Sequence, residues 1–300
     1  MQSIRRPRFK RSTAVAPIRL TDRDRMIIRL VHRHRFIRSH QICTLVGGSS
    51  QHIVRRLQLL YHHGYLERPR AQLKYYDSGG SRSIAYGLGN EGGVLLRRQF
   101  GIAVDSNSWN EKNHSIGKVF LDHALLVSEI MVALELACRK RSVRLRYEDE
   151  LDPIRKCPFQ WWVKAVNGTR LGVIPDRVFA LEYTDRNGQV QIVYFFLEAD
   201  RGTMPVIRSG LNQTSFYRKL LAYEATWTQK IHQRHLGIPR FRVLTVTTTA
   251  ERVKSLTEAC TRLKRGHGLF LFGDLSILKK DVFSPVWKLG KAGHVGGLLD

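Results

Sequence analysis

The sequence predicts a mixed α/β (α+β) chain of two domains, the first mainly helical and the second built around a sheet. Its 300 residues suit two ordinary domains better than one, and a hydrophobic fraction of 43% is sufficient for packed cores. Helical periodicity dominates the first hundred residues, whereas strand-like apolar runs follow later. We expect a flexible basic arm at 1–19, a helical domain at 20–100, a linker at 101–117, an α/β domain at 118–285 and a flexible glycine-rich tail at 286–300.

Charge is the strongest signal in the composition. The chain holds 50 Lys and Arg against 25 Asp and Glu, a formal net charge of +25, and residues 1–100 alone hold 20 basic and 5 acidic residues. Such an excess repels itself unless a polyanion is bound, and phosphate backbones favour basic proteins because binding releases condensed counterions. The composition therefore predicts a nucleic-acid-binding protein, with double-stranded DNA as the expected partner.

Several other classes of protein are excluded. No apolar run approaches the roughly 20 residues of a membrane helix, and the first residues lack a signal-peptide pattern. No cysteine pair has CxxC spacing, which argues against zinc sites and disulfide frameworks and favours a cytoplasmic location; the cysteines are Cys43, Cys138, Cys157 and Cys260. No GxxxxGK[ST], HExxH or GxSxG motif is present.

The helical domain begins at Thr21, a capping residue followed by acidic residues that favour a helix start. An apolar stripe predicts a first helix over residues 22–34, and a second fits Ser39–Val46. Gly47-Gly48 forms a turn, after which Ser49-Ser50 caps a third helix that runs to about residue 63. A strand follows Gly64, residues 78–81 form a hairpin tip, residues 82–88 return as a strand, and a fourth helix starts at Asn90.

This order of elements is that of a winged helix-turn-helix, in which the third helix reads the major groove. The polar face of that helix carries residues that can reach base edges, while its start faces phosphate. The predicted contacts on this helix are Ser49, Ser50, Gln51, His52, Arg55, Arg56 and Gln58, and those on the wing are Arg70, Lys74 and Arg82. A basic but merely solvated surface, or a protein-binding winged helix, is the alternative.

The sequence pattern of the second domain predicts helices and strands in the order α-β-β-β-α-β-α-β. A helix spans about residues 120–141, and strands are expected at 143–147, 171–183 and 189–197, the last two joined by a turn at 185–188. A helix at about 211–229, a buried strand at 241–247, a helix at 251–265 and a strand at 268–272 follow.

Two acidic residues in this predicted order of elements form a candidate metal-binding pair. Asp176 follows a proline within one strand, and Glu198 ends the next strand beside Asp200. If the turn pairs these strands, the two carboxylates meet at one rim of the sheet, where they can bind Mg²⁺ or Mn²⁺ and activate water against a phosphodiester. The alternative is a structural role, in which Asp176 caps a turn and Glu198 and Asp200 form ion pairs with Arg201 or Lys219.

Pro175-Asp176 followed by Glu198-x-Asp200, within an αβββαβ order, resembles the PD-(D/E)XK nuclease superfamily. The basic N-terminal domain followed by PDRVFAL, FFLEADRGT and YRKLLAY is similar, more closely, to the replication-relaxation family, which is associated with plasmids and integrative elements. The nuclease pattern has Lys where this chain has Asp200. The superfamily can move that lysine to the next helix, where Lys219 stands four residues before Tyr223 in a spacing that resembles the helix motif of RecB-like nucleases.

The resemblance implies a DNA-binding protein of a mobile element that acts in replication, mobilisation or its control. It implies catalytic roles for Asp176, Glu198 and Lys219, with Asp176 and Glu198 as ligands of Mg or Mn, and with Glu129, Glu135 or Asp200 as further candidate ligands. Other replication, mobilisation or transposition proteins are the implied partners. Two alternatives stay open: a non-enzymatic dimeric transcription regulator, and a structural subunit of a nucleoprotein complex.

Overall fold

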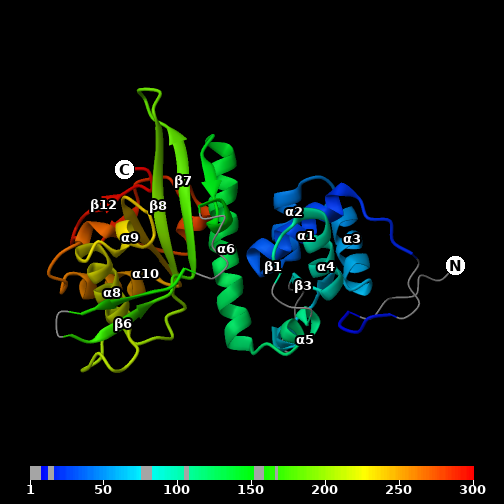
Figure 1. The fold of residues 1–300 in the computed structure, drawn as a ribbon, viewed down its shortest axis with the longest axis horizontal. Helices are drawn as coiled ribbons and strands as arrows, with labels where there is room; N and C mark the ends of the chain where they lie inside the picture. The colour runs from blue at the N-terminus through cyan, green and yellow to red at the C-terminus, as the bar shows by residue number, and fades with distance from the viewer. Residues whose placement is uncertain (1–7, 13–16, 76–82, 105–107, 152–158, 166–167) are drawn as a thin grey trace. The chain divides into compact units, whose positions relative to one another are not determined.

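The computed structural model describes residues 8–12, 17–75, 83–104, 108–151, 159–165 and 168–300. The chain divides into two compact units, residues 1–132 and 133–300 (Figure 1). The structure contains α-helices as well as a mixed β-sheet, so the predicted α/β class is confirmed. Within the described residues, no helix is both long and apolar enough to cross a membrane.

The first unit contains the four predicted helices. They are α1 (Asp22–His34), α2 (Ser39–Val46), α3 (Ser50–His62) and α4 (Asn90–Phe100). Thr21 caps α1, as the sequence indicated, and the Asp24 side chain in turn accepts from the Thr21 N–H. Three short strands, β1 (Phe36–Arg38), β2 (Leu66–Glu67) and β3 (Ala85–Leu88), form an antiparallel sheet in the order β1-β3-β2. The sequence did not predict β1, because three residues show no periodicity.

The segment between the predicted wing strands is only partly described. Residues 70–75 form the short 3₁₀ helix η1 (Arg70–Tyr75). The predicted hairpin tip at 78–81 and Arg82 lie outside the described residues.

The predicted linker at 101–117 contains a helix, α5 (Trp109–His114). Polar contacts hold it against the first unit: Asn110 and Asn90 exchange hydrogen bonds of 2.9 and 3.2 Å, and Asn113 Nδ2 donates to the Leu88 carbonyl at 2.6 Å. Hydrophobic periodicity could not reveal a helix that is held by amide side chains. The next helix, α6 (Lys118–Lys140), places Leu121, Ala124 and Leu125 in the first unit's core, so that unit extends beyond the predicted boundary.

The second unit is built on a seven-stranded mixed sheet of order β12-β11-β10-β9-β8-β7-β4. Strands β8, β9 and β10 run parallel, and the remaining neighbours are antiparallel. The strands are β4 (Arg144–Arg146), β7 (Arg177–Thr184), β8 (Val190–Ala199), β9 (Phe241–Thr247), β10 (Phe270–Asp274), β11 (Trp287–Leu289) and β12 (Val295–Gly296).

Helices and a small hairpin cover one face of this sheet. The helices of the unit beyond α6 are α7 (Glu148–Leu151), α8 (Phe216–Thr228), α9 (Ile231–Arg234) and α10 (Ala250–Cys260), with the short 3₁₀ turns η2 (His267–Leu269) and η3 (Ile277–Lys279). Strands β5 (Trp161–Lys164) and β6 (Arg170–Val173) form a separate two-stranded sheet. A core of buried side chains joins this hairpin, α8 and α10 to the sheet, and the rings of Phe196, Tyr223 and Phe241 pack against one another within it.

Two predictions for this unit were wrong in detail. The single strand expected at 171–183 is two strands, β6 and β7, which belong to different sheets. Pro175 lies between them and has no N–H to continue a ladder. The tail expected to be flexible at 286–300 instead adds β11 and β12 to the sheet, and Trp287 is fully buried.

Candidate functional site

The two predicted acids are neighbours at one end of the β7–β8 pair. Because Arg177 pairs with Leu197, the preceding Asp176 lies beside Glu198. The Asp176 N–H donates to the Leu197 carbonyl at 2.9 Å, and its Oδ2 accepts from the Ala199 N–H at 2.7 Å. Backbone hydrogen bonds therefore fix the Asp176 carboxylate at the carboxyl end of β8, the end of parallel strands where α/β folds commonly bind ligands.

The Glu198 carboxylate is 2% exposed and contacts two side chains of α8. Lys219 Nζ donates to its Oε2 at 2.5 Å, and the Tyr223 hydroxyl donates to its Oε1 at 2.6 Å. Lys219 and Tyr223 are four residues apart, so they lie on the same face of the helix. Ser215 caps this helix and fixes its start. The three residues assigned by resemblance, Asp176, Glu198 and Lys219, thus come together.

Burial and neighbouring charges set the protonation of this cluster. Burial raises the pKa of Glu198, and the Asp176 carboxylate raises it further, while Lys219 opposes both effects. Burial disfavours the charged form of Lys219, but the Glu198 and Asp176 carboxylates outweigh it and raise the pKa of Lys219. Burial and Glu198 raise the pKa of Tyr223 well above its ordinary value. At neutral pH Lys219 is therefore a cation and Tyr223 a neutral hydrogen-bond donor.

Asp200, which stands where the nuclease pattern has lysine, is engaged elsewhere. Arg252 of α10 binds it in a bidentate pair at 2.8 and 3.1 Å, and the Thr247 hydroxyl donates to it at 2.8 Å. This pair ties the end of β8 to α10. The sequence pointed to Arg201 or Lys219 as its partner, because Arg252 is far away along the chain.

The other candidate ligands lie on α6. Glu129 is exposed and belongs to the first unit, and Glu135 accepts hydrogen bonds from the Tyr147 hydroxyl and from Arg139. Within the described parts of the chain, no three or more His, Cys, Asp or Glu side chains form a group that could hold a metal ion.

Asp176 and Glu198 nevertheless fit one hard divalent cation. Their oxygens are the ligand type that Mg²⁺ and Mn²⁺ prefer, and Mg²⁺ is commonly held by one or two carboxylates together with substrate phosphates. A further buried oxygen lies next to them: Thr245 pairs with Glu198 in the parallel β8–β9 ladder, and its fully buried hydroxyl makes no hydrogen bond with any described residue. Such a hydroxyl leaves a polar position to be filled beside Glu198. Sequence reasoning missed it, because a threonine in a buried strand carries no distinguishing signal.

The predicted DNA-contacting face of α3 is largely open. Ser49 caps the helix by accepting from the His52 N–H at 3.4 Å. The exposed residues of the predicted set are Ser49, Ser50, Gln51, His52, Arg55 and Arg70, and Gln58 is half-buried. The side chain of Lys74 and all of Arg82 lie outside what the structure describes.

Arg56 has a structural partner that the sequence did not indicate. Its guanidinium binds the fully buried Asp24 carboxylate of α1 at 2.5 and 2.9 Å. Burial would raise the pKa of Asp24, but hydrogen bonds from Arg56 and Thr21 lower it below its ordinary value. Arg56 therefore holds α3 against α1, whereas the neighbouring Arg55 is exposed.

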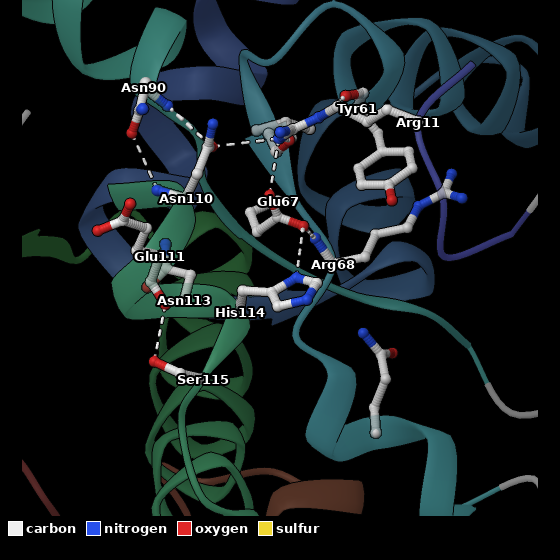
Figure 2. Close-up of polar contacts among 12 residues, drawn as sticks. Arg11, Tyr61, Glu67, Arg68, Asn90, Asn110, Glu111, Asn113, His114 and Ser115 are labelled. Carbon is white, nitrogen blue, oxygen red and sulfur yellow. Dashed lines mark hydrogen bonds and ion pairs between the residues drawn. The ribbon is translucent and has the colours of Figure 1, made fainter. Parts of the chain in front are cut away.

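Part of the predicted flexible arm is packed against the first unit. Arg11 donates to the Tyr61 carbonyl at 2.9 Å, to the buried Glu67 carboxylate at 2.7 Å and to Asn110 at 3.1 Å (Figure 2). His114 lies on the other side of Glu67, at 3.9 Å. The arm was expected to be flexible because it is basic and has little apolar content, but a buried carboxylate anchors Arg11 instead.

Comparison with known families agrees with this reading of the sequence. A family model described as replication-relaxation matches residues 28–240. Searches of curated proteins and of solved structures returned no match.

Proposed function

Because the chain belongs to the replication-relaxation family, we propose that it binds DNA and acts in the replication or mobilisation of a plasmid or another mobile element. In this proposal the first unit is a winged helix that binds the duplex. The second unit is a PD-(D/E)XK-like nuclease that cuts a DNA strand, with Asp176, Glu198 and Lys219 as its catalytic residues. The observation that carries the proposal is the convergence of these three residues at one end of the sheet: Asp176 immediately precedes β7, Glu198 lies in β8 and Lys219 lies in α8.

Each residue of the cluster has a distinct part in such a reaction. Asp176 and Glu198 would hold one Mg²⁺ or Mn²⁺, which polarises the phosphodiester and lowers the pKa of a bound water. Lys219, a cation at neutral pH, places positive charge where the phosphate gains negative charge. Tyr223 holds Glu198 in position through its hydroxyl. The lysine that the nuclease pattern places two residues after the glutamate thus has a counterpart on α8.

Cleavage is tested with full-length protein and supercoiled plasmid in Mn²⁺. We expect nicking that Asp176→Ala and Glu198→Gln each reduce by at least about 100-fold, because only an interaction with the reacting group changes the rate so strongly. Glu251→Gln, which alters an exposed carboxylate of α10, is the matched control and should cut normally. If Glu198→Gln cuts as well as Glu251→Gln, the cleavage site does not include Glu198, and if the native protein does not cut, a non-enzymatic regulator or structural subunit takes the place of the nuclease.

Duplex binding is tested by two adjacent arginines of α3. Arg55→Ala should weaken duplex affinity by about 1–3 kcal/mol without changing stability, because Arg55 is exposed. Arg56→Ala should lower the free energy of unfolding by about 1–3 kcal/mol, because it leaves the buried Asp24 without its partner. Fluorescence anisotropy with a labelled duplex and urea unfolding separate the two effects. Unchanged affinity for folded Arg55→Ala would remove α3 from the duplex interface.

A further inference from the structure

The β5–β6 hairpin presents a sheet face that the proposed cleavage site does not use. In both strands buried and exposed residues alternate, and the two strands pair Trp162 with Gly172 and Lys164 with Arg170. These four residues point to the exposed side, whereas Trp161, Val163, Leu171 and Val173 point into the core. The exposed face contains two cations and an aromatic ring but no carboxylate.

Trp162 is held flat on this face. A Cβ at Gly172 would meet its ring at 3.2 Å, so the indole packs against the glycine backbone. The Arg170 guanidinium lies over the ring, 4.5 Å from its centroid. The side chain nevertheless stays 49% exposed. The ring covers the backbone of Gly172, which accounts for its position. A large part of the indole surface nevertheless remains exposed to solvent.

The opposite side of the hairpin is fastened to the helix of the cleavage site. Trp161 donates from its indole N–H to the Thr226 hydroxyl of α8 at 2.8 Å. Its ring lies 6.5 Å from that of Tyr223, the residue that binds Glu198. Strand β6 also leads directly into Asp176 through Ile174 and Pro175, and Ile174 is 57% exposed. At ~3.3 Å per extended residue, the six residue-to-residue steps from Arg170 to Asp176 span at most roughly 20 Å.

We propose that this face binds single-stranded DNA, with a base stacked on Trp162 and phosphates paired with Arg170 and Lys164, and that it guides the strand to Asp176 and Glu198. The inference rests on the proposed cleavage of DNA and names the form of the substrate. The Arg170 guanidinium that lies over the ring would move to a phosphate as a base takes its place on the indole, and an exposed aromatic ring beside cations suits an unstacked base and its phosphates. In a duplex the bases are already stacked and offer no face to an indole. A basic face without carboxylates also favours a polyanion over an ordinary protein surface.

The test measures anisotropy of a fluorescein-labelled oligo(dT), which forms no duplex, with full-length protein. Trp162→Ala should weaken oligo(dT) binding by about 5- to 100-fold, the range of a lost base–aromatic stack. Trp162→Phe should retain most of the affinity, because it keeps a ring. Duplex affinity should be the same in all three proteins. Equal oligo(dT) affinity of Trp162→Ala and the native protein would overturn the proposal, as would equal losses for oligo(dT) and duplex.

Charge supplies an independent arm of the test. Arg170→Ala should make the log–log salt dependence of oligo(dT) binding shallower by about 0.7, the contribution of one phosphate contact in a single strand. Arg186→Ala removes the same charge from the exposed β7–β8 turn and should leave the slope unchanged. Equal slopes for the two variants would overturn the placement of the phosphates.

The outcome is separable from that of the cleavage assay. Asp176→Ala should bind oligo(dT) at least as tightly as the native protein, because it removes a carboxylate and leaves the hairpin face intact. If no variant or condition gives cleavage but Trp162→Ala still lowers the affinity for oligo(dT), the nuclease assignment fails and the single-strand site stands. If cleavage depends on Asp176 but oligo(dT) affinity does not change in Trp162→Ala, the nuclease assignment stands and the single-strand site fails.

Discussion

Glu198 shows how a single buried carboxylate depends on its neighbours. Its two oxygens accept hydrogen bonds from the Lys219 ammonium and the Tyr223 hydroxyl. Without these partners, burial would favour the protonated form of the carboxyl group. A buried ion pair costs desolvation, and breaking it leaves an uncompensated charge. The ion pair of Glu198 and Lys219, which the proposed cleavage reaction uses, therefore also affects the stability of the second unit, and the two roles can be separated by pH.

We predict that Lys219→Met destabilises the protein more at pH 8 than at pH 5. Without the ammonium, burial and Asp176 raise the pKa of Glu198 further above its unfolded value. A carboxyl group whose pKa is raised in the folded state stabilises that state below its unfolded pKa, and this contribution is lost as the pH rises through the folded pKa. Urea unfolding of native and variant proteins at both pH values measures the difference. A pH-independent loss would mean that Glu198 is solvated well enough not to need Lys219.

Adding Glu198→Gln to Lys219→Met provides the control. The double variant removes the titrating group, so its stability relative to the native protein should vary much less between pH 5 and pH 8. A double variant with the same pH dependence as Lys219→Met would assign the effect to another group.

At the scale of elements, sequence reasoning succeeded where one physical signal was strong. Capping at Thr21 and Ser49 fixed the starts of α1 and α3, and long apolar runs located β8 and β9. The pairing of β7 with β8 followed from the turn between them, and this brought Asp176 next to Glu198.

Elements that depend on contacts distant in sequence were not predictable. Helix α5 is held by Asn90 and Asn110, and β5 is only four residues long. Glycines at 290–297 indicated a flexible tail, yet Trp287 is fully buried there. The candidate acids and lysine followed from a motif, whereas Thr245 and Arg252 became visible only when strand neighbours and α10 were in place.

We predict that the tail is part of the stable fold of the second unit. Trp287→Ala should reduce the free energy of unfolding by about 3–5 kcal/mol, the usual cost of removing a buried aromatic side chain. The Trp287 indole N–H also donates to the Val282 carbonyl at 2.8 Å. Lys288→Ala, an exposed neighbour on β11, should change stability by less than about 0.5 kcal/mol. Urea unfolding monitors both variants, and equal stabilities would restore the frayed tail that the sequence indicated.

Over the whole molecule the basic excess is shared by both units. Residues 1–132 hold 22 Lys and Arg against 9 Asp and Glu, and residues 133–300 hold 28 against 16. Both units therefore attract phosphate, which agrees with the proposed duplex site in the first and the proposed strand-binding face in the second. Some of the basic side chains are used internally, as the ion pairs of Arg11, Arg56 and Arg252 demonstrate, so the number of Lys and Arg residues overstates the number of phosphate contacts.

The arm offers the sharpest separation of these two uses of charge. We expect duplex affinity to fall with salt with a log–log slope of roughly −4 to −8, as for several neutralised phosphates. Deleting residues 2–7 removes Arg5 and Arg6 and should make the slope shallower by up to about 1.8, with the melting temperature unchanged, because this segment offers little apolar surface. Deleting residues 2–12 also removes Arg11, which neutralises the buried Glu67, and should lower the melting temperature as well. Anisotropy titrations at several salt concentrations and thermal unfolding measure the two effects. Equal melting temperatures for the two deletions would show that Arg11 contributes nothing to stability, and an unchanged slope would show that the arm does not touch phosphate.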